Sequence, residues 1–150
     1  MQVRFKYLRE DVMLPSYGSK DAAALDLFLP LALEKVEFHH GETKVIPLGF
    51  KIEIPKGYVG KVKARSSMWS KGWRVSGFID SDYRGEVSLM IQSPSLHATG
   101  LALPTTFVLE GGQKVAQFLI EEAICIEPVW ADELTETARG EGGFGSTGNK

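Results

Sequence analysis

The longest apolar run of the chain is KVAQFLIEEAICIEPV, which extends from Lys114 to Val129. Shorter runs precede it, with apolar residues that alternate with polar ones or follow one another: VRFKYL (3–8), KVIPLGFKIEIP (44–55), GYVGKV (57–62), EVSLMIQ (86–92) and TFVLE (106–110). Glycine, proline and serine separate the runs, which is typical of short strands joined by turns. The sequence therefore predicts a strand in each run, and we expect the last strand to end near Trp130.

Helical signals are weak throughout the chain. Seven prolines are scattered along it, which suits loops and strand edges and opposes long helices. The best helix candidate is SSMWSKG, which would form about two turns from Ser66 onward. A chain of 150 residues with many short strands and frequent turns fits one all-β domain, either a sandwich or a barrel.

The composition is that of an ordinary globular domain, with 43% hydrophobic and 24% charged residues. No apolar run approaches the roughly 20 residues of a membrane-spanning helix, and no signal segment opens the chain. The single cysteine, Cys125, excludes an internal disulfide, and its place in AICIEPV predicts a buried thiol. These features predict a cytoplasmic protein.

The net charge of −2 hides an asymmetry along the chain. Between Ile54 and Ile79 there are six basic residues and no acid, whereas between Glu121 and Glu136 there are six acids and no base. The segments could be two solvated surfaces of opposite sign, or the basic one could form a local anion site. Because a nucleic-acid-binding protein more often has an overall basic surplus, a small polyanion such as a polyphosphate fits better.

Five polar or glycine-rich stretches accompany the apolar runs: AAALDLF (22–28), ARSSMW (64–69), GFIDSDYRGE (77–86), GGQKVAQ (111–117) and RGEGGFGSTGNK (139–150). Taken singly, most have ordinary structural explanations. Asp26 could be a turn acid at a strand end, and Ser66 or Ser67 could cap a helix. Asp80 could belong to a hairpin turn, and Gln117 could be a strand residue facing water.

Taken together and in this order, the five stretches resemble the five motifs of the trimeric dUTPase family, from Ala23 to Gly148. The resemblance implies an all-β, jelly-roll-like or distorted-barrel fold, with a β domain over residues 1–136 and a flexible C-terminal lid arm over 137–150. It also implies an enzyme, a dUTP diphosphatase that hydrolyses dUTP to dUMP and pyrophosphate. That reaction limits the incorporation of uracil into DNA and supplies dUMP for thymidylate synthesis.

The third stretch carries the catalytic and nucleoside residues that the resemblance implies. Asp80 would activate the water that attacks the α-phosphate. Tyr83 would pack under the deoxyribose, where a 2′-hydroxyl would not fit. Backbone groups of Gly77, Phe78 and Ile79 would read uracil, and glycine permits the close approach that such reading needs.

The second and fourth stretches carry the implied phosphate contacts. Ser66 and Ser67 begin a helix, whose free N–H groups and hydroxyls form a natural anion site. Gln117 would donate to the α-phosphate. Arg65 is either a phosphate ligand or the partner of a carboxylate such as Asp26 or Asp82. Mg²⁺ is implied as the cofactor, carried by the triphosphate with waters completing its octahedron, so no direct protein ligand is expected.

The fifth stretch is too rich in glycine to build a core, and the resemblance gives it a use. In the family the tail crosses to a neighbouring subunit of a homotrimer and orders over the bound nucleotide, as a lid. Arg139 would then meet the γ-phosphate and Phe144 would stack on uracil. Gly145, Ser146 and Thr147 would offer N–H and hydroxyl donors to the phosphates.

The chain departs from the family pattern at several positions. Ala24 stands where the first motif has glycine, and Ala64 and Ser67 replace the usual proline and glycine of the second. The loop from Ser93 to Thr106 is longer than usual and could be a decoration, a subunit contact or the site of an additional protein partner. We expect His39, His40 and His97 at the surface, without a metal.

Two rival functions are considered. One is that of dCTP deaminase, an enzyme that shares the fold, and the other is that of a purely regulatory binding module. The intact third stretch and the tail argue against both.

Overall fold

A computed structural model describes residues 1–95 and 106–143. In these ranges the chain forms ten strands and one short helix: β1 (Arg4–Tyr7), β2 (Ser16–Tyr17), β3 (Leu25–Phe28), β4 (Val36–Phe38), β5 (Thr43–Glu53), β6 (Tyr58–Ala64), α1 (Ser66–Trp69), β7 (Arg74–Ile79), β8 (Glu86–Gln92), β9 (Phe107–Leu109) and β10 (Lys114–Glu122). Each apolar run of the sequence contains a strand, so the predicted all-β class is confirmed.

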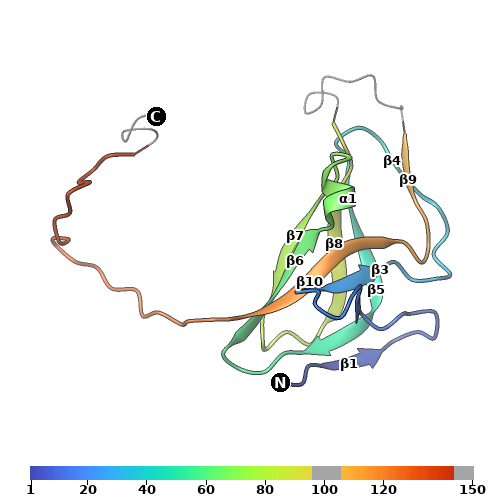
Figure 1. Cartoon of the computed structure of the whole chain (residues 1–150), viewed down its shortest axis with the longest axis horizontal. Helices are drawn as coiled ribbons and strands as arrows, with labels where there is room; N and C mark the ends of the chain where they lie inside the picture. The colour runs from blue at the N-terminus through green and yellow to red at the C-terminus, as the bar shows by residue number, and fades with distance from the viewer. Residues whose placement is uncertain (96–105, 144–150) are drawn as a thin grey trace.

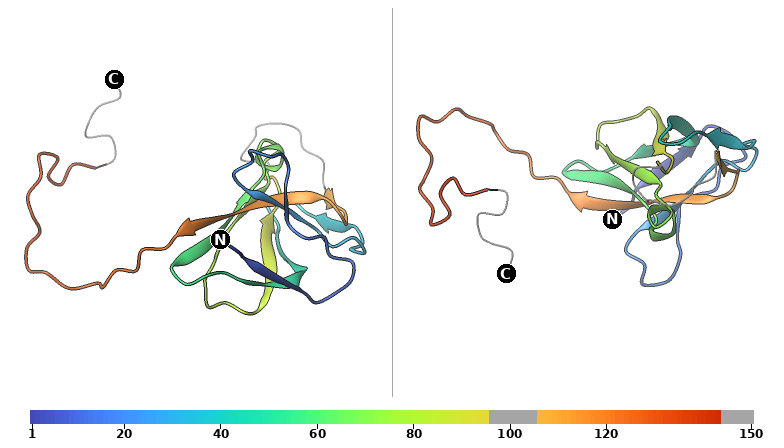
Figure 2. Two further views of the ribbon diagram at one scale, coloured as in Figure 1. Left: turned by 60° about the horizontal axis from the view of Figure 1, so that its bottom comes forward. Right: turned by 90° about the horizontal axis from the view of Figure 1, so that it is seen from above.

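Eight strands form one sheet in the order β1-β5-β8-β7-β6-β10-β3-β2, and β4 and β9 pair as a separate two-stranded ribbon. All the pairings are antiparallel. The large sheet curls around its concave face, and the ribbon stands beside it (Figure 1, Figure 2). This curled sheet is the distorted-barrel architecture that the family resemblance implies.

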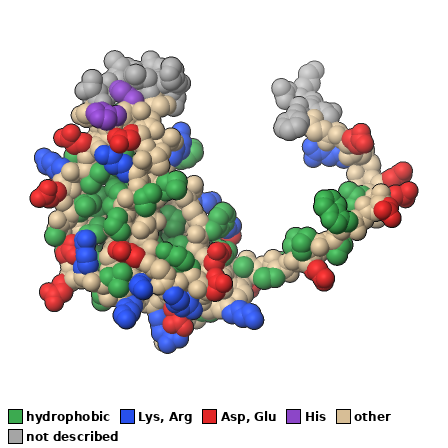
Figure 3. All heavy atoms as spheres, turned by 180° about the vertical axis from the view of Figure 1, so that it is seen from behind, with side chains coloured by type: hydrophobic (Ala, Val, Ile, Leu, Met, Phe, Trp, Pro, Cys, Tyr) green, Lys and Arg blue, Asp and Glu red, His purple; other side chains and the backbone are tan. Residues whose placement is uncertain are grey.

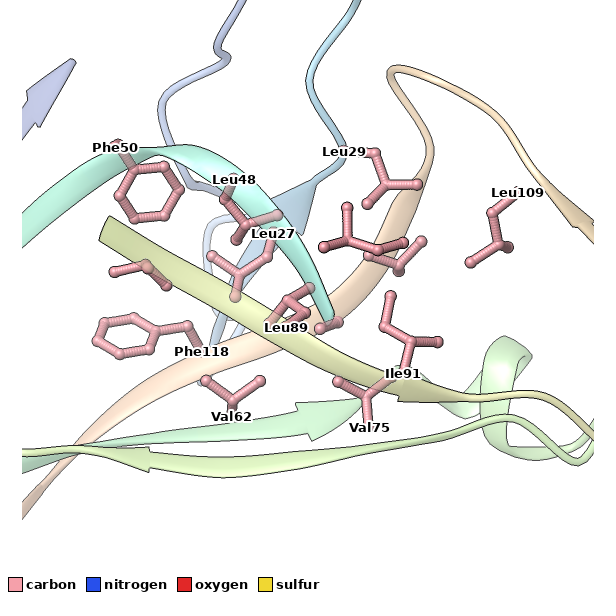
Figure 4. Packing of buried hydrophobic residues seen from close by; sticks show 14 of the residues in the cluster. Leu27, Leu29, Leu48, Phe50, Val62, Val75, Leu89, Ile91, Leu109 and Phe118 are labelled. Atoms are coloured by element: carbon pink, nitrogen blue, oxygen red, sulfur yellow. The ribbon is translucent and has the colours of Figure 1, made fainter. Parts of the chain in front are cut away.

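The core fills the inside of the curl (Figure 4). Strand β8 shows how the sequence encodes it, since Val87, Leu89 and Ile91 are buried while the residues between them face outward. This period of two places one apolar face of each strand against the others. The centre of the curl is packed so closely that a Cβ added to Gly60 of β6 would lie 2.4 Å from Phe118 Cε2.

Strand β10 ends at Glu122, eight residues before the predicted end near Trp130. The reason is the length of its partner. Glu122 pairs with Tyr58, the first residue of β6, and Ala123 N–H donates to Gly57 O at 2.8 Å, beyond which β6 offers no further ladder. The rest of the apolar run leaves the body as an extended arm (Figure 1, Figure 3). The prediction that Cys125 is buried is therefore wrong, because its thiol is exposed on this arm.

Two smaller predictions also need correction. The helix after Arg65 is the single turn α1, which is shorter than the two turns predicted. His39 is exposed as predicted, but His40 is half-buried and packs edge-on against Phe107, with ring centroids 5.4 Å apart. His97 lies outside the described residues. Within 1–95 and 106–143, no helix has the length and apolar character needed to cross a membrane.

Candidate active site

The registers of three neighbouring strands place the first and fourth polar stretches side by side. Asp26 on β3 pairs with Gln117 on β10, and Gln117 pairs in turn with a residue of β6. Directly paired residues share one face of a sheet, so Asp26 and Gln117 lie together on the face opposite the core. Segments that are more than 80 residues apart in sequence therefore meet at this place.

Asp26 is the buried anion of this region, with a side chain only 3% exposed. Two cations hold it: Arg65 Nε lies 3.0 Å from one carboxylate oxygen, and Lys114 Nζ lies 3.0 Å from the other. A carboxylate out of water needs such partners, because an uncompensated buried charge is strongly destabilising. The geometry supports the carboxylate-partner alternative for Arg65. Lys114 was missed by sequence reasoning, although it stands three residues before Gln117 in the fourth stretch.

Helix α1 follows Arg65 directly. Ser66 and Ser67 are exposed, and neither hydroxyl caps the helix, because its N-cap is Arg65 without a side-chain bond. The first backbone bonds of the turn are donated by Met68 and Trp69 to Arg65 O. The first N–H groups of a helix have no partner within the helix, so those of Ser66 and Ser67 are available with the hydroxyls to an anion.

The third stretch forms the end of the β7–β8 hairpin. Gly77, Phe78 and Ile79 finish β7, and Asp80 begins the connection to β8. A pocket of about 200 Å³ lies here, lined by Phe78, Ile79, Asp80, Tyr83, Val87 and Ser88. Asp80 and Tyr83 are both exposed, and Phe78 is 72% exposed. The hairpin thus presents a carboxylate beside aromatic and backbone groups.

Tyr83 is held in place by its own turn. Its hydroxyl donates to Glu86 O at 2.8 Å, and its backbone N–H donates to Asp80 O at 3.1 Å. A Cβ on Gly85 would lie 2.4 Å from the Tyr83 hydroxyl, so glycine is required at that position for this orientation of the ring. The position of the ring relative to Asp80 is therefore set by a short, hydrogen-bonded connection.

The predicted residues do not all come together within one chain. In the β6–β7 pairing, Gly60 lies opposite Ile79, which places Asp80 near the start of β6, whereas Arg65 and α1 follow its end (Figure 1). Six residues along a strand span about 20 Å at roughly 3.3 Å per residue. The Asp80 hairpin and the group formed by Arg65, Ser66, Ser67 and Gln117 thus occupy opposite ends of the β6–β7 pair.

The described part of the tail around residue 139 lies on the extended arm, away from the body that carries both groups (Figure 1). Arg139 Nε donates to Gly142 O at 2.7 Å within a local turn. Phe144, Gly145, Ser146 and Thr147 lie outside the described residues. In the described ranges, no cluster of three or more His, Cys, Asp or Glu side chains could hold a metal ion.

Comparison with known proteins identifies the family to which a chain with this fold and these site residues belongs. The dUTPase family model matches residues 10–148. The deoxyuridine 5′-triphosphate nucleotidohydrolase of Hydrogenobaculum sp. (strain Y04AAS1) is 36% identical over an alignment of 154 positions, which covers 100% of each chain. The corresponding protein of Rhizobium etli is 38% identical over 149 residues, covering 93% of this chain and 87% of its own.

Solved structures agree with the sequence comparison. The dUTPase of Staphylococcus bacteriophage 80alpha with dUPNHPP superimposes with a TM-score of 0.84 at 25% identity, covering 98% of each chain. A dUTPase from phage phi11 of S. aureus, described as coordinating a structural Mg(II) ion, has a TM-score of 0.76 and covers 89% of this chain and 98% of its own. The fold and the site define an enzyme of nucleotide metabolism. The chain belongs to the dUTPase family, which confirms the resemblance found in its sequence.

Proposed function

We propose that the protein hydrolyses dUTP to dUMP and pyrophosphate at sites shared between the subunits of a homotrimer. The observation that carries this proposal is the separation of the Asp80 hairpin from the phosphate-binding group along β6 and β7. One nucleotide cannot bridge about 20 Å within a chain, whereas the hairpin of one subunit can face the phosphate group of the next. The names of the relatives supply the substrate.

The nucleoside would bind at the hairpin pocket. Uracil would meet the backbone of Gly77, Phe78 and Ile79, and the deoxyribose would rest on the Tyr83 ring. Because the Tyr83 hydroxyl is already engaged by Glu86 O, the ring cannot easily move aside for a 2′-hydroxyl. This would exclude UTP in favour of dUTP.

Asp80 would act as the general base. Its exposed carboxylate stands beside the nucleoside pocket, where it can accept a proton from a water positioned against the α-phosphate. The oxygen of that water forms the new bond to phosphorus, and the bond to the bridging oxygen breaks, which releases pyrophosphate. Removal of dUTP in this way would limit uracil in DNA and supply dUMP for thymidylate synthesis.

The neighbouring subunit would neutralise the triphosphate. Ser66 and Ser67 would donate N–H and hydroxyl groups to the phosphates, and Gln117 would donate to the α-phosphate. Arg65 would mainly fix the position of α1, because its Nε is bonded to the buried Asp26. The pair thus holds the start of α1 close to β3 and to the neighbouring strand β10, which carries Gln117.

The side chains of this region are compatible with a Mg²⁺ ion that arrives bound to the nucleotide. The most buried carboxylate of the region, Asp26, is occupied by two cations, so it is not free to ligate the ion. When bound, the ion would add positive charge beside the phosphates, with waters filling its octahedron. The residues of this chain would bind the phosphates and orient the water around it.

The arm would complete the site from a further subunit. Beyond β10 its side chains are exposed, with Ile124 87% and Trp130 103% exposed, so the segment finds no packing on its own body. Arg139 would bind the γ-phosphate, Phe144 would stack on uracil, and Gly145, Ser146 and Thr147 would donate to the phosphates. Ordering such a glycine-rich segment costs backbone entropy, which the bound triphosphate would offset.

Release of pyrophosphate from dUTP, dCTP, dTTP and UTP tests the activity directly. We expect turnover of dUTP at least a hundredfold above the other three, and no ammonia from dCTP. Ammonia released from dCTP would assign the deaminase reaction instead. If no nucleotide reacted, the protein would be assigned as a regulatory binding module.

Mixed trimers test whether the sites are shared. Chains carrying Asp80→Asn and chains carrying Gln117→Ala should each be nearly inactive alone. Unfolded and refolded together in equal amounts, they should regain about a quarter of wild-type activity, because a quarter of the interfaces then pair two intact halves. If the mixture stays as inactive as its components, each site lies within a single chain.

A further inference from the structure

Several cations gather on the outward face of β6, β7 and the strands beside them. Gln117 on β10 lies opposite Lys63 on β6, which in turn lies opposite Ser76 on β7. Together with Asp26 they form one row across four strands, all on the face away from the core. This row leads from the buried Asp26 to the middle of the β7 strand.

Most of the cations near this row are already engaged. Arg65 is bonded to Asp26, and Lys61 forms an ion pair with Glu121. Arg74 stacks on Trp69 of α1, with the guanidinium carbon 3.9 Å from the ring centroid, and donates to Trp73 O. These contacts fix each side chain and, for the first two, neutralise its charge.

Lys63 differs from these neighbours. It is exposed, and among the described residues it has neither an ion pair nor a side-chain hydrogen bond. The strand β6 that carries it and the strand β7 beside it contain no acid, so nothing on either strand offsets its charge. Among the described residues, Lys63 therefore places an uncompensated ammonium next to Gln117, where it is available to a ligand.

We propose that Lys63 is a further phosphate-binding residue of this enzyme, which contacts the triphosphate alongside Gln117. The inference rests on the proposed function. Directly paired side chains have Cβ atoms about 4.5–5.5 Å apart, so a lysine can reach the same phosphate as the amide of its neighbour. The amide and the α1 donors are directional, whereas an ammonium adds a compact charge that tolerates several phosphate positions. The basic segment between Ile54 and Ile79 then has a specific use.

The test compares Lys63→Gln with Lys6→Gln. Lys6 is an exposed strand lysine on β1, also without an ion pair among the described residues, so both variants lose one equivalent charge. Binding of the non-hydrolysable analogue dUPNHPP and of deoxyuridine is measured by calorimetry at two salt concentrations, and the oligomeric state by sedimentation. We expect Lys63→Gln to weaken dUPNHPP about tenfold, as one lost charge-assisted contact does, with reduced salt dependence.

The accompanying measurements separate this contact from other roles. Deoxyuridine affinity should be unchanged, Lys6→Gln should bind dUPNHPP as wild type does, and Lys63→Arg should restore most of the affinity. The inference is overturned if Lys63→Gln binds dUPNHPP within twofold of wild type, if Lys6→Gln loses as much, or if Lys63→Gln dissociates the oligomer. A wild-type protein that binds no dUPNHPP would instead overturn the proposed function itself.

Discussion

Arg65 Nε lies 3.0 Å from Asp26 Oδ1, and this contact ties the end of β6 to β3 across the intervening strand β10. The carboxylate is buried, while the guanidinium is 29% exposed. The pair therefore anchors α1, with Ser66 and Ser67, against the strand that carries Gln117. Of the two roles that the sequence left open for Arg65, the fold supports the structural one, a partner of Asp26 that supports the residues proposed to bind phosphate.

Asp26→Asn should destabilise the protein strongly. The change leaves Arg65 and Lys114 without their shared anion, and because both cations are partly exposed the cost should be about 1.5–3 kcal/mol, as for lost hydrogen bonds to a charged group. Thermal and urea unfolding at a fixed protein concentration would measure it. Glu53→Gln, at the exposed pair with Arg4, is the control and should cost no more than about 1 kcal/mol. Equal losses in the two variants would mean that Asp26 is not a brace.

Asp80→Asn should remove catalysis and keep binding. The amide cannot accept a proton from water, so turnover should fall by about 10²–10⁴-fold, while affinity for dUPNHPP stays within roughly tenfold. Steady-state kinetics and calorimetry would check both values. Glu34→Gln, an exposed carboxyl-to-amide change in the loop after β3, is the control and should retain full turnover. More than a tenth of wild-type turnover in Asp80→Asn would show that another group is the base.

Tyr83→Ala should relax discrimination between dUTP and UTP. Removal of the ring opens space under the sugar, so the ratio of kcat/KM values for the two nucleotides should fall at least tenfold. Tyr83→Phe keeps the ring and loses only the bond to Glu86 O, so it should retain most of the discrimination. An unchanged ratio in Tyr83→Ala would remove Tyr83 from the sugar site.

Truncation after Ala138 should separate folding from catalysis. The described residues beyond it are exposed or half-exposed and make only local contacts, so the melting temperature should shift by no more than a few degrees. Turnover should fall by orders of magnitude, because the proposed lid would no longer align the triphosphate and exclude water. Calorimetric melting would test the effect on folding, and pyrophosphate release would test the effect on turnover. A truncated protein with normal turnover would contradict the lid.

Gly60→Ala should destabilise the core of the curl. Its new methyl group would lie 2.4 Å from Phe118 and 2.9 Å from Ile54, and overpacking of this kind costs about 1–3 kcal/mol. Gly77→Ala is the matched change on the neighbouring strand, where a Cβ would meet nothing within 4 Å, so its stability should stay close to wild type. Urea unfolding of both variants gives the comparison, and equal stability would contradict the packing at Gly60.

The sequence by itself predicted the apolar runs that contain β1, β5, β6, β8, β9 and β10, and it predicted the family. EVSLMIQ predicted β8 with its bounds, because a period of two over seven residues leaves no helical alternative. The five polar stretches predicted the family, since they follow one another in the family's order despite the departures at Ala24, Ala64 and Ser67. The domain division at residue 136 and the roles of the individual site residues remain predictions.

Only the tertiary structure decided where the strands stop and which charges pair. The run from Lys114 to Val129 stays rich in apolar residues to its end, yet β10 ends at Glu122 because its partner strand β6 begins at Tyr58. From the sequence, Arg65 could pair with Asp26, pair with Asp82 or bind a phosphate. The register of β3, β10 and β6 places it beside Asp26, with which it forms an ion pair. Strand length and ion pairing depend on residues that are distant along the chain, so local sequence cannot specify them, whereas periodicity and motif chemistry are local and can be read directly.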